Sequence, residues 1–160
     1  MSDTEAVLPA IMWVMDDGGR AAAGYRGVTG DCATRAVAIA SGRSYREIYD
    51  RINNLARLER RGKRKKGISD ARTGVYPATM RKLLEEIGAV WVPTMAIGSG
   101  CTVHVRMHEL PMGRLVLRLS KHFTACVDGV LHDTFDPSRG GTRAVYGYWV
   151  LPEPEPDEDE

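Results

Sequence analysis

The spacing of apolar side chains divides the chain into a helical first half and a strand-rich second half. Apolar residues that recur at i, i+3, i+4 and i+7 predict three helices, over residues 31–41, 44–56 and 77–87. Short apolar or alternating runs predict strands over residues 11–15, 89–93, 101–105, 114–119 and 144–150. Helices that precede an antiparallel sheet indicate the α+β class rather than a doubly wound sheet.

Two of these elements carry more specific patterns. Leu115, Leu117 and Leu119 alternate with other residues, which predicts that the strand over 114–119 is buried on one face only. Residues 11–15 are few and are followed by an Asp-Asp-Gly-Gly turn, so we expect them to form an edge strand.

Capping residues fix where the helices begin and end. Asp31 stands at the expected N-cap of the first helix, and Gly42 suits the left-handed residue that ends it. Ser44 and Glu47 are three residues apart, as in a capping box, and predict the start of the second helix. Cys32 therefore falls in the first turn of the first helix.

The segment Ser120–Pro137 predicts a β-hairpin whose turn is Asp128-Gly129, because Asp-Gly readily supplies the positive φ angles of a tight hairpin turn. With that turn, the register makes His122 and Asp133 diagonal cross-strand neighbours on one face, within hydrogen-bond reach. Asp136 falls on the other face. It replaces Asp133 as the partner of His122 if the register differs by one residue.

These residues suggest a catalytic triad. A thiol is nucleophilic as the thiolate, and the positive end of a helix dipole lowers its pKa, although the neighbouring Asp31 opposes this effect at Cys32. We therefore expect Cys32 to attack an acyl carbon, His122 to carry the proton and Asp133 to fix the imidazole tautomer. The backbone N–H of Cys32 is the expected oxyanion donor, with Thr29 as a second candidate.

Charge is distributed unevenly along the 160 residues, although the net charge is only +1. Residues 153–160 hold six acids and no base, and a Pro-rich acidic tail over 152–160 is predicted to be disordered. Residues 57–66 hold seven bases against one acid, within a basic linker over 57–76. We interpret this linker as a solvated loop. Its patch could alternatively contact nucleic acid or an acidic partner, through Arg60, Arg61, Lys63, Arg64, Lys65 and Lys66.

Length and composition favour a single domain over residues 1–151. The chain has no apolar run of about 18 residues and its first twenty residues do not resemble a signal peptide, so a cytoplasmic protein without membrane contact is expected. Three cysteines without framework spacing argue against a disulfide scaffold.

Metal binding is the competing chemistry. Cys101, His104 and His108 are ligand types, but an odd separation places Cys101 and His104 on opposite sides of a predicted strand. We therefore predict no metal and no cofactor.

The strings G-D-C-A-T-R-A and H-F-T-A-C-V-D-G-V-L-H-D-T resemble the papain-like cysteine peptidase superfamily in a compact bacterial or phage form. The resemblance covers Gly30 to about Ala40 and Leu115 to Trp149. It implies a helix carrying Cys packed on an antiparallel sheet carrying His and then Asp, and hydrolysis of a peptide or amide-bearing substrate. The strings V-P-T-M-A-I-G-S-G-C-T-V-H and D-P-S-R-G-G-T-R-A-V-Y-G-Y-W are also similar to a group of phage-related bacterial proteins. The alternative is a non-catalytic binding or adaptor protein that uses the basic 57–66 segment on the same scaffold.

Overall fold

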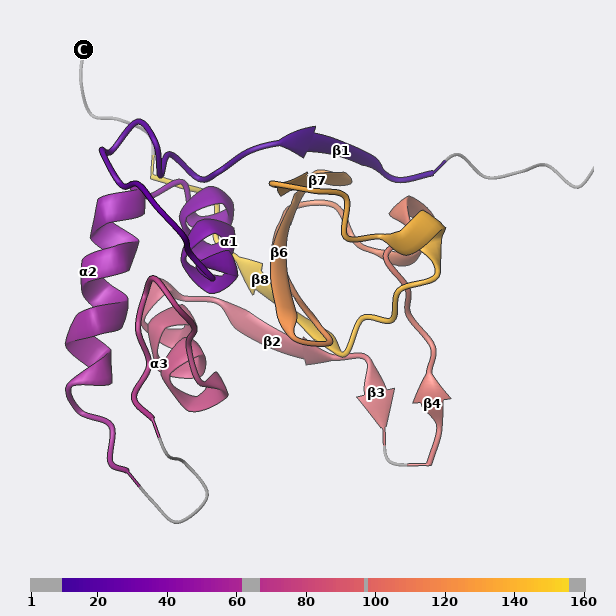
Figure 1. The fold of residues 1–160 in the computed structure, drawn as a ribbon. Helices are drawn as coiled ribbons and strands as arrows, with labels where there is room; N and C mark the ends of the chain where they lie inside the picture. The colour runs from indigo at the N-terminus through magenta and orange to yellow at the C-terminus, as the bar shows by residue number, and fades with distance from the viewer. Residues whose placement is uncertain (1–9, 62–66, 97, 156–160) are drawn as a thin grey trace, which may run out of the picture.

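The computed structural model describes residues 10–61, 67–96 and 98–155. Three helices pack on one face of a six-stranded sheet: α1 (Cys32–Ser41), α2 (Tyr45–Ala56) and α3 (Pro77–Ile87) (Figure 1). The predicted α+β class is therefore confirmed, with the helices first in the chain and most of the sheet after them.

The strand order of the sheet is β1-β7-β6-β5-β8-β2. Neighbouring strands are antiparallel except β1, which lies at one edge and pairs in parallel with β7. The bounds of these strands are β1 Met12–Met15, β2 Val90–Pro93, β5 Arg114–Leu119, β6 His122–Val127, β7 Val130–Asp133 and β8 Gly147–Leu151. A separate two-stranded sheet joins β3 (Met95–Ala96) to β4 (Gly100–Cys101), and short 3₁₀ turns cover Met107–Glu109 and Arg139–Gly141.

The helix ends largely follow the capping residues. The Ser44 hydroxyl accepts a hydrogen bond of 3.1 Å from the backbone N–H of Glu47, and Gly42 ends α1 with φ at 72°. Asp31 occupies the predicted N-cap position of α1, but its side chain makes no cap hydrogen bond. The carboxylate turns instead towards buried partners, Arg35 and Tyr45.

Both faces of the sheet are covered by apolar side chains. The helices pack against one face around Val116 and Ala125, whereas Val105, Leu110 and Val145 cover the other face around Leu117. Leu117 and Val116 are both fully buried, so the prediction that this strand is buried on one face only is wrong. Residues 103–111 and 143–145, which carry almost no regular structure, provide the second cover.

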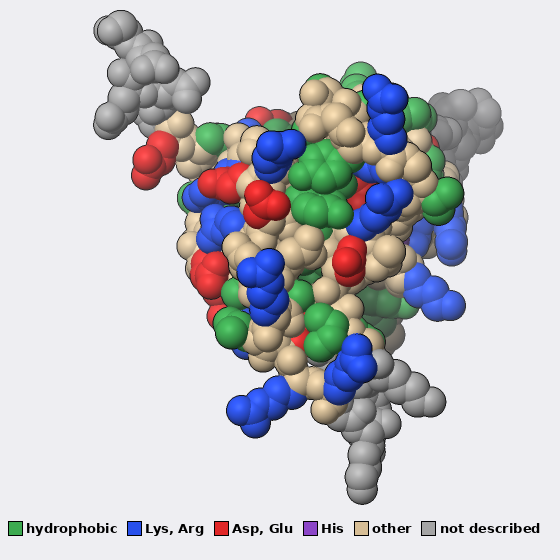
Figure 2. All heavy atoms as spheres, turned by 60° about the vertical axis from the view of Figure 1, so that its left-hand side comes forward, with side chains coloured by type: hydrophobic (Ala, Val, Ile, Leu, Met, Phe, Trp, Pro, Cys, Tyr) green, Lys and Arg blue, Asp and Glu red, His purple; other side chains and the backbone are tan. Residues whose placement is uncertain are grey.

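The basic segment is described only in part. Arg60 and Arg61 follow α2 and are exposed, whereas Lys63, Arg64, Lys65 and Lys66 lie outside the described residues. On the face that includes α2, acidic and basic side chains are interspersed around apolar ones (Figure 2). Residues 152–155 of the predicted tail form neither helix nor strand, and residues 156–160 lie outside the described part. No helix in the described part of the chain has the length and apolar character needed to cross a membrane.

Candidate active site

The hairpin between β6 and β7 has the turn that its sequence predicts. Asp128 and Gly129 both have positive φ, 48° and 81°, and Val127 pairs with Val130 across the turn. This register places His122 Nε2 2.7 Å from Asp133 Oδ2. The side chains are almost enclosed, with 9% of His122 and 2% of Asp133 exposed. The predicted contact between the two residues is therefore confirmed.

Helix α1 brings the thiol of Cys32 to this pair. Cys32 is the first residue of α1, which packs against β6, and its partly exposed side chain lines the same two cavities as His122. Because Nε2 of His122 faces Asp133, the other ring nitrogen, Nδ1, is the one that remains to exchange a proton with the thiol. The three residues come from α1, β6 and β7, and they meet at the end of the sheet opposite the Asp128-Gly129 turn.

The pKa values of the three side chains differ from their ordinary values in directions that favour a charged site. Burial raises the pKa of Cys32, but the hydrogen bonds from His122 and the Phe123 backbone outweigh it, so the pKa of the thiol is lowered. Burial lowers the pKa of His122, but its hydrogen bonds with Asp133 and Cys32 outweigh that effect and raise the pKa overall. Burial raises the pKa of Asp133, but its hydrogen bond with His122 outweighs that effect and lowers the pKa overall. These directions favour a thiolate beside an imidazolium.

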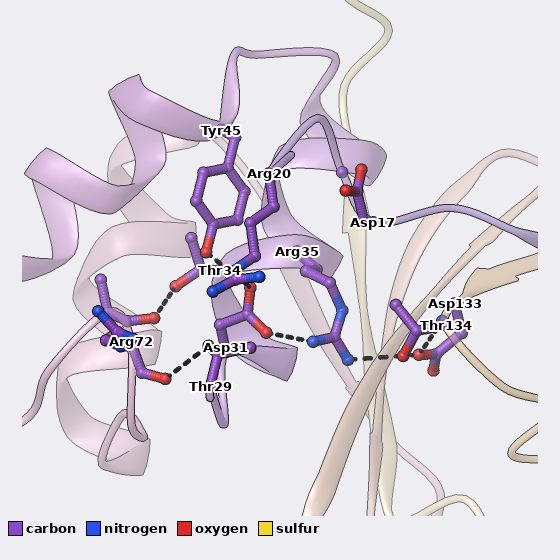
Figure 3. Close-up of polar contacts among 12 residues, drawn as sticks. Asp17, Arg20, Thr29, Asp31, Thr34, Arg35, Tyr45, Arg72, Asp133 and Thr134 are labelled. Atoms are coloured by element: carbon purple, nitrogen blue, oxygen red, sulfur yellow. Dashed lines mark hydrogen bonds and ion pairs between the residues drawn. The ribbon is translucent and has the colours of Figure 1, made fainter. Parts of the chain in front are cut away.

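A buried ionic network of Asp31, Arg35 and Tyr45 extends to Asp133 (Figure 3). The Asp31 carboxylate, 1% exposed, bonds to the Arg35 guanidinium and accepts a hydrogen bond of 2.6 Å from the Tyr45 hydroxyl. The second terminal nitrogen of Arg35 lies 3.4 Å from Asp133 Oδ1. Asp31 was expected to oppose formation of the thiolate at Cys32. Its charge is instead paired with a cation that also holds Asp133.

Two cavities adjoin the Cys32–His122 pair, and both residues line each of them, together with Lys121. The first, which we call the apolar arm, has a volume of about 330 Å³, and its apolar lining includes Ala33, Val75, Pro77, Leu119, Phe123 and Tyr146. The second, the polar arm, has a volume of about 610 Å³ and is lined by polar groups that include Asp17, Arg20, Thr29, Asp31, Thr73 and Thr134. These volumes fall in the range of ligand sites, and an extended substrate laid across both arms would cross the thiol.

Two of the alternative site residues have other partners. Asp136 is exposed, and its Oδ1 accepts a hydrogen bond of 3.0 Å from the backbone N–H of Ser138. The Thr29 hydroxyl donates its proton to the carbonyl of Arg72 at 2.9 Å, so that proton is not directed at an oxyanion. The backbone N–H of Cys32 is left as the predicted donor.

The geometry around Cys101 corrects one prediction. Its Sγ lies 3.7 Å from Nε2 of His104, whereas an extended strand would have placed them on opposite sides. Strand β4 ends at Cys101, and the irregular backbone that follows turns His104 back towards it. His104 Nδ1 lies 3.2 Å from a carboxylate oxygen of Glu109. Across residues 10–61, 67–96 and 98–155, no group of three or more His, Cys, Asp or Glu side chains is arranged to hold a metal ion.

The supporting network is not predicted by the sequence patterns. The i, i+4 spacing of Asp31 and Arg35 on a helix is a signal for their ion pair, but nothing local connects Arg35 to Asp133, which is 98 positions further along the chain. The contribution of Tyr45 is equally non-local, because its hydroxyl reaches Asp31 from the next helix.

Comparisons with protein-family models, with curated proteins and with solved structures give no significant match.

Proposed function

We propose that the chain is a thiol hydrolase that cleaves an amide bond through Cys32, His122 and Asp133, on a compact papain-like scaffold. The observation that carries this proposal is the assembly of a helix-start thiol, an imidazole and a carboxylate from three separate elements. The order Cys, His, Asp along the chain, with the thiol on a helix and the other two on an antiparallel hairpin, is also the order in the papain-like superfamily that the sequence resembles.

In the acylation step, the Cys32 thiolate attacks the carbonyl carbon of the substrate and the carbonyl π electrons move to oxygen. The backbone N–H of Cys32, at the positive end of α1, donates to the resulting oxyanion. The tetrahedral intermediate collapses, the carbon–nitrogen bond breaks, and the protonated His122 gives its proton to the departing amine. The products of this half-reaction are a free amine and a thioester on Cys32.

In the deacylation step, neutral His122 removes a proton from water while the water oxygen attacks the thioester carbon. Collapse of the second tetrahedral intermediate releases the acid and returns the thiolate, with the proton on His122. Asp133 keeps Nε2 of His122 as a hydrogen-bond donor throughout, so Nδ1 stays directed at the reacting atoms. Attack by an amine in place of water turns the same cycle into acyl transfer.

Alkylation by iodoacetamide tests whether the thiol is activated, and it needs no known substrate. At pH 6.5 Cys32 is expected to react faster than Cys101 and Cys126, as measured by mass spectrometry of each cysteine peptide. Cys126 sets the slow limit, because burial raises its pKa to about 11. The His122→Ala variant is expected to lose the fast phase, whereas His132→Ala, whose ring contacts Asp16 instead, retains it.

Turnover is tested with p-nitrophenyl acetate, an activated ester that any acyl-forming thiolate attacks. The wild-type chain is expected to release a burst of nitrophenol equal to the enzyme concentration and then to turn over slowly. Cys32→Ala abolishes both phases, and Cys101→Ser leaves both intact. A Cys32→Ala chain that keeps the wild-type burst and steady rate contradicts the proposal.

A further inference from the structure

The apolar arm carries positive charge without any negative charge. Arg118 and Lys121 line it, and Arg81 joins Arg118 in an adjoining recess of about 30 Å³. No Asp or Glu is among the described residues that line either space. These three cations have no hydrogen-bond or ion-pair partner for their side chains within the described part of the chain.

The polar arm differs in this respect. Its two arginines, Arg20 and Arg35, both lie within ion-pair distance of the Asp31 carboxylate. Lys121 lines both arms, but the polar arm also contains the carboxylates of Asp17 and Asp31, whereas no described acid lines the apolar arm. The two arms therefore present different charges to a substrate.

Aromatic rings form the apolar surface next to the free cations. The recess is bounded by Trp91, Trp149 and Phe123, and the two indoles are 5.2 Å apart between ring centroids. The recess shares Phe123 and Arg118 with the apolar arm, so the two spaces adjoin. Trp91 lies over Gly147 of β8, where a side chain would collide with its ring. The sheet thus holds the indole in place before any ligand arrives.

From this juxtaposition we infer that the substrate places an apolar group bearing a carboxylate in the apolar arm. An aromatic or large aliphatic body fits the ring-lined surface, and guanidinium and ammonium groups that have no acidic partner favour a carboxylate. The inference rests on the proposed function for the bond that is cleaved. Recognition of the carboxylate itself requires no turnover, and it is therefore tested separately.

Tryptophan fluorescence reports binding at this position, because Trp91 and Trp149 line the recess. The third tryptophan, Trp13, lies on β1 at the far edge of the sheet and is removed by Trp13→Phe. In this background, N-acetylphenylalanine is expected to change the emission with a Kd about tenfold or more below that of its neutral amide. The preference is expected to fall as salt is raised. N-acetylglutamylphenylalaninamide, with the carboxylate on a side chain, distinguishes an acidic side chain from a chain terminus as the source of the charge.

Neutral variants locate the charge that is recognised. Arg118→Gln combined with Lys121→Asn is expected to remove most of the preference for the acid, and asparagine suits the positive φ of 55° at position 121. Arg81→Gln is expected to weaken it in part. Lys82→Gln, on the same helix as Arg81 but outside both linings, serves as the matched control and leaves both Kd values unchanged.

Equal affinity for the acid and the amide overturns the inference, and so does a preference that survives loss of all three cations. Failure of the proposed function has a different signature. In that case Cys32 alkylates no faster than Cys101, whatever the fluorescence titration shows. A chain that prefers the acid but lacks an activated thiol binds carboxylates without being a hydrolase.

Discussion

The Arg35 guanidinium contacts one carboxylate oxygen of Asp133, and His122 contacts the other. Oδ1 of Asp133 lies 3.4 Å from the guanidinium, and Oδ2 lies 2.7 Å from His122 Nε2. The same guanidinium binds Asp31, directly before the thiol. The first turn of α1 and the end of β7 are therefore joined by one cation, and the relative position of Cys32 and His122 depends on it.

Removing that cation should destabilise the fold. Arg35→Met leaves two buried carboxylates without their shared partner, and loss of one member of a buried pair costs about 3 kcal/mol or more. The free energy of unfolding, measured in urea at pH 7, is expected to fall by about that amount. Arg43→Met removes an exposed i, i+4 pair with Glu47 and is expected to cost less than about 1 kcal/mol. Equal effects of the two substitutions would contradict the structural role of Arg35.

Substitution of Asp133 tests how the site is activated. The Asp133 carboxylate raises the pKa of His122 against the opposing effect of burial. In Asp133→Asn the pKa of His122 should fall, and the thiolate then loses its imidazolium, so the pKa of Cys32 should rise. The midpoint of the iodoacetamide rate against pH is expected to move upward. If the midpoint rises by about one pH unit, the rate at pH 6 should fall about tenfold.

Asp136→Asn is the control for this substitution. Asp136 has the same charge and lies three residues away, but it bonds to Ser138 rather than to His122. The iodoacetamide rate of the Asp136→Asn variant is expected to depend on pH as that of the wild type does. If Asp136→Asn shifts the profile and Asp133→Asn does not, Asp136 rather than Asp133 is the third member of the triad.

The sequence predicts the contact of His122 with Asp133 because its determinants are local. Asp128-Gly129 sets the turn, and the turn sets the register that brings His122 to Asp133. The C-terminal end of α1 is also set by a local feature, because Gly42 takes the left-handed conformation there. Both features depend on backbone conformations that few residue types adopt readily, and such preferences are visible in a single sequence.

Most of the features that were missed depend on contacts that the local helix and strand patterns do not show. Asp31 has the residue type of an N-cap, but its carboxylate bonds to Arg35 one helical turn further on and to Tyr45 of α2. The i, i+4 spacing is a signal for the first of these contacts, whereas no local pattern predicts the second. The parallel pairing of β1 with β7 joins residues 12 and 130, and no local pattern encodes it. The contact of Cys101 with His104 was missed because β4 is shorter than its apolar pattern predicts.

Stability should depend on pH through the same pair. The folded-state pKa of His122 is raised, so its contribution is complete below its unfolded pKa of about 6.5 and is lost as pH rises through the folded value. The pKa of Asp133 is lowered, so its contribution is present above about 3.9 and is lost as pH falls through the depressed value. The two contributions coexist between these limits.

The difference in free energy of unfolding between wild type and His122→Gln is therefore expected to be greatest near pH 5 to 6. It should decrease both at pH 9 and below pH 3, as measured by urea unfolding across that range. His108→Gln provides the control, because this exposed ring is not part of the network. A difference that grows steadily from pH 5 to pH 9 contradicts a raised pKa of His122 in the folded state.

Gly147 tests whether the aromatic recess is held in place by the sheet. In β8 it pairs with Pro93 of β2, and a Cβ atom added there would overlap the Trp91 ring. Gly147→Ala is therefore expected to displace the indole and to lower the free energy of unfolding by about 1–3 kcal/mol. Binding of N-acetylphenylalanine should weaken with it. Trp91→Leu in the same chain removes the overlap. The double variant should therefore lose about 1 kcal/mol less free energy of unfolding than the two single substitutions lose together. Strict additivity would show that Trp91 can move away from Gly147 without cost.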